Sequence, residues 1–140
     1  MDIRKKVSSL RKKYKTNNPF DIAKSLGITI LFEELGGING YYNKQLRMKQ
    51  IHINCNLPRH EQSFTCAHEL GHALLHPNAN TPFLRKKTYL SVEKLEMEAN
   101  KFAIELLISD EDLLEYKNYT TEQVSHIFGY HKGLIDLRLR

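Results

Sequence analysis

The chain has 140 residues, of which 41% are hydrophobic and 26% are charged, and its net charge is +5. This length and composition predict one globular domain over residues 1–140, large enough to bury a core without disulfides. No segment approaches the roughly 18 apolar residues of a membrane span, which excludes an integral membrane protein. The basic clusters are expected to be solvated helix faces and loops, with a footprint for an acidic partner or nucleic acid as the alternative.

Two features of the sequence indicate the cellular compartment of the protein. The segment Met1–Lys6 is charged and lacks the apolar stretch of a secretory signal. The two cysteines, Cys55 and Cys66, do not have the spacing of a disulfide framework. We therefore expect a protein of the reducing cytoplasm.

The first half of the chain is expected to form two helices and then three short strands. The helices are predicted from apolar residues at helical spacing and from a proline suited to a first turn, at Ile3–Tyr14 and Pro19–Gly27. The strands are runs of β-branched and aromatic residues, at 28–32, 38–42 and 50–55. The polar segment 43–49 is expected to form the turn between the last two strands.

The second half is expected to be helical. A long helix is predicted from Pro58 to about His76, followed by a loop over 77–90. Ser91 is expected to cap a helix over roughly 92–107. Three shorter helices are indicated by capping residues or apolar spacing, after Ser109, after Thr120 and across 134–139.

One motif carries recognisable chemistry. His68-Glu69-Leu70-Gly71-His72 has the pattern H-E-x-x-H inside the predicted long helix. Because four residues make just over one turn, His68 and His72 share a face and can converge on one metal ion, for which zinc is the usual occupant. Glu69 can then take a proton from a water molecule that the metal activates. Two histidines leave coordination positions open, as a catalytic site requires.

The surroundings of the motif favour this interpretation over a helix that carries two histidines by coincidence. Apolar residues that a helix would bury flank the motif, namely Phe64, Ala67, Leu70, Leu74 and Leu75. Gly71 costs the helix about 1 kcal/mol relative to alanine. We therefore expect that another backbone, or a substrate, approaches the helix closely at this glycine.

The third ligand must come from another segment. His76 continues the row of histidines, but a straight helix cannot bend three successive turns around one ion. On the helix predicted over 92–107, Glu96 shares a face with small residues that permit close packing, whereas Glu98 is rotated from it by about 200°. Glu96 is therefore the expected ligand, with Glu98 as the alternative. Asn100, one turn after Glu96, could hydrogen-bond a ligand histidine.

Other assignments remain open from the residues alone. Glutamates 93, 98 and 105 are expected on a solvated helix face. The oxyanion of peptide hydrolysis needs a further donor, and the candidates are Tyr41, Tyr42, Tyr89, His52 and His76. One of the strands 38–42 and 50–55 is expected to pair with an extended substrate. The helix-Gly-helix pattern of 121–140 is expected to pack on the catalytic domain rather than to bind DNA.

At these residues the chain resembles the ImmA/IrrE-type zinc metallopeptidases. The resemblance is strongest over Ala67–His76 and over Glu96–Leu107, which fits the family pattern E-x-x-A-N-x-F-A-x-x-L-L. Asp21–Ile28 and Phe128–Leu139 look like the family's N-terminal helix-to-strand and C-terminal helical segments. One departure is Ile108-Ser109, where the family often has Met-Pro. This departure changes how the ligand helix ends and leaves the metal residues intact.

The predicted elements and the resemblance together imply an α+β, zincin-like single domain. In it, a small three-stranded sheet packs against the H-E-x-x-H helix, the third-ligand helix and further N- and C-terminal helices. The resemblance also implies a Zn²⁺ ion with His68, His72 and Glu96 as ligands and Glu69 as the base.

The function implied by the resemblance is cleavage of a helix-turn-helix repressor, which induces the genes of a phage or mobile element. The protein would act as a cytoplasmic zinc endopeptidase without contacting membrane or nucleic acid directly. The alternative is a catalytically silent, zinc-containing regulator that binds a repressor or another protein. Glu69 separates the two hypotheses, because a purely structural zinc site needs no base. A DNA-binding protein is a third, less supported hypothesis.

Overall fold

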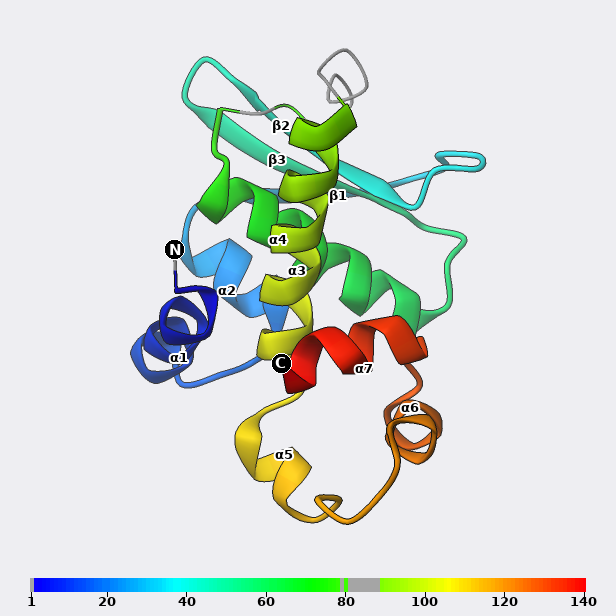
Figure 1. Cartoon of the computed structure of the whole chain (residues 1–140). Coiled ribbons are helices and arrows are strands. Elements are labelled where there is room, and N and C mark those ends of the chain that lie inside the picture. Colours follow the sequence, from blue (N-terminus) through cyan, green and yellow to red (C-terminus); the bar gives the residue numbers. More distant parts are fainter. Residues whose placement is uncertain (1, 79, 81–88) are drawn as a thin grey trace.

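The computed structural model describes residues 2–78, 80 and 89–140, with residues 89–91 described by their backbone (Figure 1). Helices and strands follow one another in the order α1 (Ile3–Tyr14), α2 (Pro19–Ser25), β1 (Thr29–Glu33), β2 (Gly40–Gln45), β3 (Met48–Asn54), α3 (Arg59–Leu75), α4 (Tyr89–Leu107), α5 (Asp110–Leu114), α6 (Thr121–Phe128) and α7 (Lys132–Leu139). This arrangement confirms the expected α+β fold. None of the helices in the described part of the chain combines the length and hydropathy of a membrane span.

The sheet is small and mixed. Its strand order is β1-β3-β2, with β1 parallel and β2 antiparallel to the central β3. The β2–β3 hairpin is longer than expected, because Asn43 pairs with Gln50 and Gln45 with Met48, which leaves a turn of two residues at 46–47. The prediction of a turn over 43–49 was therefore wrong. Hydrophobic patterning cannot reveal this part of the hairpin, because its residues are only partly buried or exposed and so can be polar.

The main core lies between the sheet and four helices. One face of the sheet packs on α3, which in turn lies against α4, while α1 and α2 cover the side (Figure 1). Large side chains fill this core without solvent exposure, among them Ile22, Tyr42, Ile51, Ile53, Leu70 and Phe102. Helix α3 is thus surrounded by protein, and side chains on several of its faces are held in fixed positions.

The C-terminal helices α5, α6 and α7 form a second, smaller core against the end of α4, around Ile104, Ile108, Val124 and Ile135. The predicted caps are present, since the side chains of Ser109 and Thr120 accept hydrogen bonds from the backbone of Asp112 and Gln123. The expected packing of this segment on the rest of the domain is confirmed.

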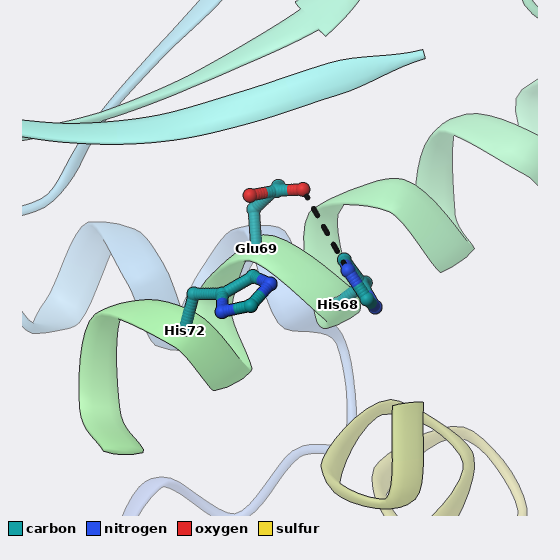
Figure 2. A group of neighbouring side chains, drawn as sticks. All are labelled: His68, Glu69 and His72. Carbon is teal, nitrogen blue, oxygen red and sulfur yellow. Dashed lines mark ion pairs between the residues drawn. The ribbon is translucent and has the colours of Figure 1, made fainter. Parts of the chain in front are cut away.

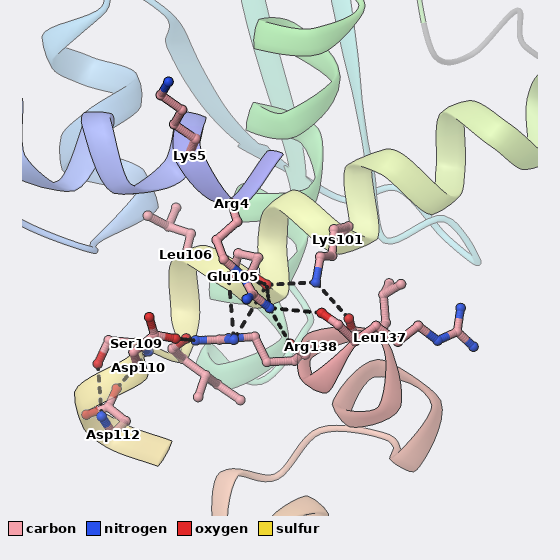
Figure 3. Close-up of polar contacts among 12 residues, drawn as sticks. Arg4, Lys5, Lys101, Glu105, Leu106, Ser109, Asp110, Asp112, Leu137 and Arg138 are labelled. Atoms are coloured by element: carbon pink, nitrogen blue, oxygen red, sulfur yellow. Dashed lines mark hydrogen bonds and ion pairs between the residues drawn. The ribbon is translucent and has the colours of Figure 1, made fainter. Parts of the chain in front are cut away.

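A buried ionic cluster joins α1, α4 and α7 (Figure 3). Glu105 is only 2% exposed, and its carboxylate lies 2.8 Å from Lys101 Nζ, 3.4 Å from Arg4 Nε and 3.5 Å from Arg138 Nη1. Arg138 is equally buried and also donates to the Ile108 carbonyl at 2.8 Å. The expectation that Glu105 lies on a solvated face was therefore wrong. A buried carboxylate needs cationic partners, and here they come from segments far apart in the sequence.

Helix α4 begins earlier than expected. Its described part already includes Tyr89, so Ser91 lies within the helix and is not its cap. No proline or glycine separates Pro82 from the end of α4, so nothing in the sequence forces a helix start at Ser91. Most of the loop predicted over 77–90 lies outside the described residues.

Candidate metal centre

The candidate site is built where α3 crosses α4. The two helices approach closely at Gly71, where an added Cβ would lie 3.1 Å from Phe102 Cβ and 3.2 Å from the Ala99 carbonyl oxygen. On α4, Ala99 and Ala103 are fully buried and are small enough to permit this approach. The expected close approach of a backbone at Gly71 is thus observed, and it brings α4 side chains within reach of the histidines of α3.

The histidine side chains of the H-E-x-x-H motif lie together and face one carboxylate of α4. The ligand atoms of His68, Glu69 and His72 lie within 4.8 Å of one another (Figure 2). Glu96 Oε2 is 3.0 Å from His68 Nε2, and Glu96 Oε1 is 2.8 Å from His72 Nε2. One carboxylate therefore spans both imidazoles, as the sequence predicts for Glu96. Glu98 points elsewhere, with its Oε1 3.7 Å from His76 Nε2.

Burial leaves ring nitrogens of this site unsatisfied. Among the described residues, His72 Nδ1, His72 Nε2 and His68 Nδ1 have no hydrogen-bond partner, although they are shielded from solvent. His72 Nε2 is close to Glu96 but not in hydrogen-bond geometry. Buried polar atoms are normally paired, so atoms left unpaired in this way require an explanation. Two imidazoles and one carboxylate form a ligand set that fits Zn²⁺.

The charges at the site are coupled. Burial works to raise the pKa of Glu96, but the imidazoles of His68 and His72 outweigh it and hold that pKa far below its ordinary value. Burial works to lower the pKa of His68, but hydrogen bonding to Glu96 and the charges of Glu69 and Glu96 raise it overall. The side chain of Asn100 also hydrogen-bonds His68 and acts in the same direction. Glu96 is therefore ionised, which is the form in which a carboxylate binds a metal.

A cavity of about 260 Å³ opens onto these residues. Its lining comes from β2 and the residue before it, from α3 and from α4, and consists of Asn39, Gly40, Phe64, Thr65, His68, Glu69, Glu96 and Asn100. The cavity is small, so a peptide segment rather than a folded domain can reach the carboxylates. A more open groove of about 770 Å³ lies elsewhere, between α1, α4 and α7, and none of the four candidate site residues lines it.

Of the candidates for an oxyanion donor, the four whose side chains the structure describes do not line this cavity. The Tyr42 hydroxyl donates to the Pro77 carbonyl at 2.7 Å, and Tyr41 stacks on the ring of His52 with centroids 4.2 Å apart. His76 faces Glu98, and the side chain of Tyr89 lies outside the described residues. Sequence reasoning missed the uncharged polar groups that do line the cavity, Asn39 and Thr65. No local pattern distinguishes them, because their position depends on how β2 crosses α3.

Comparisons with known proteins match most of the chain. Residues 23–140 match the model of the Peptidase_M78 family, described as the IrrE N-terminal-like domain. The chain is 44% identical over 139 residues to "Uncharacterized immunity region protein 2" of Bacillus phage phi105, covering 97% of this chain and 88% of that protein. It is 36% identical over 143 residues to "Metallopeptidase ImmA" of Bacillus subtilis (strain 168), covering 98% and 83%.

A solved structure has a similar fold. A Mycobacterium tuberculosis transcriptional regulator superposes with a TM-score of 0.63 over 99% of this chain, at 13% sequence identity. The chain spans 46% of the length of that regulator. At this identity the likeness concerns the fold alone.

Proposed function

The chain belongs to the Peptidase_M78 family, and on that premise we propose that it is a zinc-dependent endopeptidase with His68, His72 and Glu96 as its metal ligands. Membership of the family and similarity to a protein named as a metallopeptidase support the coarser statement that the chain is a metallopeptidase. The observation that carries the choice of ligands is the Glu96 carboxylate, which faces the imidazoles of His68 and His72 at 3.0 and 2.8 Å.

Glu69 is the proposed general base. Zinc bound at the site would polarise the scissile carbonyl and lower the pKa of a water molecule. Glu69 is 5% exposed, lines the cavity and has its Oε2 3.9 Å from His68 Nε2. From this position its carboxylate accepts a proton from the attacking water and returns it to the leaving amine.

The proposed substrate is a helix-turn-helix repressor, present with the protein in the cytoplasm. The similarity to an immunity region protein of a phage and to ImmA supports a substrate that controls phage or mobile-element genes. The size of the cavity favours cleavage at an exposed, extended segment of that repressor, because a folded domain does not fit within about 260 Å³. The burial of Arg138 in the ionic cluster with Glu105 argues against direct DNA binding through α7.

We further propose that the substrate pairs with β2. Of the two strands considered from the sequence, β3 is central in the sheet that the described residues form, so β2 is the one that lies at an edge. The Lys44 N–H points away from β3, since it donates to Asn80 Oδ1 at 2.6 Å. Gly40 lies in the same phase of the strand and also lines the cavity. Proline substitutions around the scissile bond of the substrate should slow cleavage, and unaffected cleavage would contradict this pairing.

The test of the function incubates the purified chain and zinc with the repressor encoded by the neighbouring gene. Wild type should cleave, whereas Glu69→Gln should bind zinc equally well and cleave about 100- to 10,000-fold more slowly. Glu61→Gln, at an exposed glutamate of the same helix, is the matched control and should cleave normally. Equal cleavage by Glu69→Gln would exclude this base, and absence of cleavage by wild type would favour the silent regulator.

A further inference from the structure

His76 is a buried histidine outside the proposed set of metal ligands. Its side chain is 9% exposed, and its Nε2 has no hydrogen-bond partner among the described residues. The residue caps the C-terminal end of α3, where its backbone N–H donates to the His72 carbonyl at 2.7 Å. Its ring centroid lies 5.7 Å from that of His72. A buried ring nitrogen in this position is unfavourable unless a neighbouring group compensates for it.

The compensating group comes from α4. Glu98 Oε1 lies 3.7 Å from His76 Nε2, within ion-pair distance, and the Glu98 side chain is itself only 19% exposed. The backbone of Leu95, on the same turn of α4, also lies close to the imidazole. His76 thus contacts the same helix that carries Glu96, but at a different point.

The contacts between the two helices form a pattern. His68 and His72 on α3, and His76 directly after its end, recur every four residues and therefore follow one side of the helix. On α4, Glu96 meets the first two histidines and Glu98 meets the third. Glutamates 96 and 98 point about 200° apart around α4, on either side of Ala99, whose carbonyl lies close to Gly71.

We propose that His76 and Glu98 form a positioning pair that fixes the rotation of α4 against α3 and so holds Glu96 at His68 and His72. The close contact at Gly71 limits the distance between the helices but does not by itself prevent α4 from rolling. Two polar contacts, one on each side of Gly71, do prevent this rotation of α4. A rotation of α4 that separates His76 from Glu98 would also shift the Glu96 carboxylate from its position facing both imidazoles. The pair rests on the zinc site proposed above and contributes no ligand to it.

The experiment measures zinc binding without requiring a substrate. Zinc dissociation constants are obtained by chelator competition for wild type, His76→Ala, Glu98→Leu and Glu98→Gln, together with the Co²⁺ absorption spectrum of each protein. We expect about 10- to 100-fold weaker zinc binding and an altered Co²⁺ spectrum for His76→Ala and Glu98→Leu. Glu98→Gln should stay within about threefold of wild type, since glutamine keeps the size of the glutamate and a polar group beside the imidazole.

Glu93→Leu is the matched control, because it removes an exposed glutamate from the same helix. It should bind zinc as wild type does. Combining His76→Ala with Glu98→Leu should weaken binding no further than either change alone, since the two residues act as a unit. Circular dichroism and thermal unfolding of the metal-free proteins establish that each variant is folded.

Two results would overturn the positioning role while leaving the zinc site in place. One is wild-type zinc affinity and an unchanged Co²⁺ spectrum in folded His76→Ala and Glu98→Leu, with only a lower unfolding temperature. The other is a loss in Glu98→Gln as large as that in Glu98→Leu. Failure of wild type itself to bind zinc would instead contradict the proposed function.

Discussion

Two of the carboxylates on helix α4, those of Glu105 and Glu96, have different surroundings. Glu105 is 2% exposed and is matched by cations from α1, α4 and α7 (Figure 3). Glu96 has a side chain that is 41% exposed and faces two imidazoles with unpaired, buried ring nitrogens. The first cluster has its partners within the chain and therefore stabilises the fold. The second is left incomplete by the residues that the structure describes and is therefore suited to binding a ligand.

The largest effect on stability is expected when the ionic cluster around Glu105 is broken. Arg138→Ala would remove one cation from Glu105 and the donor to the Ile108 carbonyl. We expect the free energy of unfolding to fall by about 3–5 kcal/mol in urea denaturation. Arg140→Ala, at the exposed neighbouring arginine, should change it by less than about 0.5 kcal/mol. A loss below about 1 kcal/mol for Arg138→Ala would show that the cluster is not a stabilising one.

A change at the site around Glu96 should alter zinc binding. Glu96→Ala removes the carboxylate that spans both imidazoles, so zinc affinity should fall by more than about 100-fold, beyond the range for loss of a supporting partner. Isothermal titration with zinc measures this change, with Glu93→Ala as the control on the same helix. Unchanged zinc affinity in Glu96→Ala would show that Glu96 is not a metal ligand and that the third ligand is another residue.

Gly71→Ala tests how closely the two helices must approach. The added methyl group would lie 3.1 Å from Phe102 Cβ, so overpacking of about 1–3 kcal/mol outweighs the gain of about 1 kcal/mol in helix propensity. We expect a net loss of up to about 2 kcal/mol in unfolding free energy and weaker zinc binding as α4 is displaced. Gly133→Ala, in α7, meets only its neighbouring His131 side chain and should be neutral or stabilising. A stabilised Gly71→Ala with normal zinc affinity would show that the approach is not needed.

The smallest effect on stability is expected at Asp110, on the solvent-facing side of the ionic cluster around Glu105. A hydrogen bond from Arg138 holds the pKa of Asp110 below its ordinary value of 3.8. The stabilisation of the fold by ionised Asp110 is therefore fully present above pH 3.8. It is lost as the pH falls through the lower pKa that Asp110 has in the folded state. Asp110→Asn should lower the unfolding free energy by less than about 1 kcal/mol near pH 7, because the Asp110 side chain is 80% exposed. The difference from wild type should vanish in acid, and a difference that persists there would exclude this ion pair as its cause.

Parts of this contrast could be read from the sequence. The H-E-x-x-H spacing placed His68 and His72 on one face of a helix, and helical phase favoured Glu96 over Glu98. The loss of helix propensity at Gly71 pointed to a close approach, which the structure shows. The same reasoning failed at Glu105, because a solvated helix face and an ionic cluster with distant arginines have the same local pattern. It also missed the pairing of 43–45 with 48–50, whose polar residues carry no signal of burial.

What the sequence by itself determined is therefore local: the helix that carries the two histidines and Glu69, the serine and threonine caps of α5 and α6, and the phase of Glu96 on its helix. These features depend on residues three or four positions apart, whose geometry is set by the helix itself. Only the tertiary structure decided which side chains line the cavity, which cations meet Glu105, and that Glu98 meets His76. Those contacts depend on how α4 crosses α3 and packs on α1 and α7. Crossing angles and rotations arise from the packing of whole helix surfaces and not from spacing along the chain.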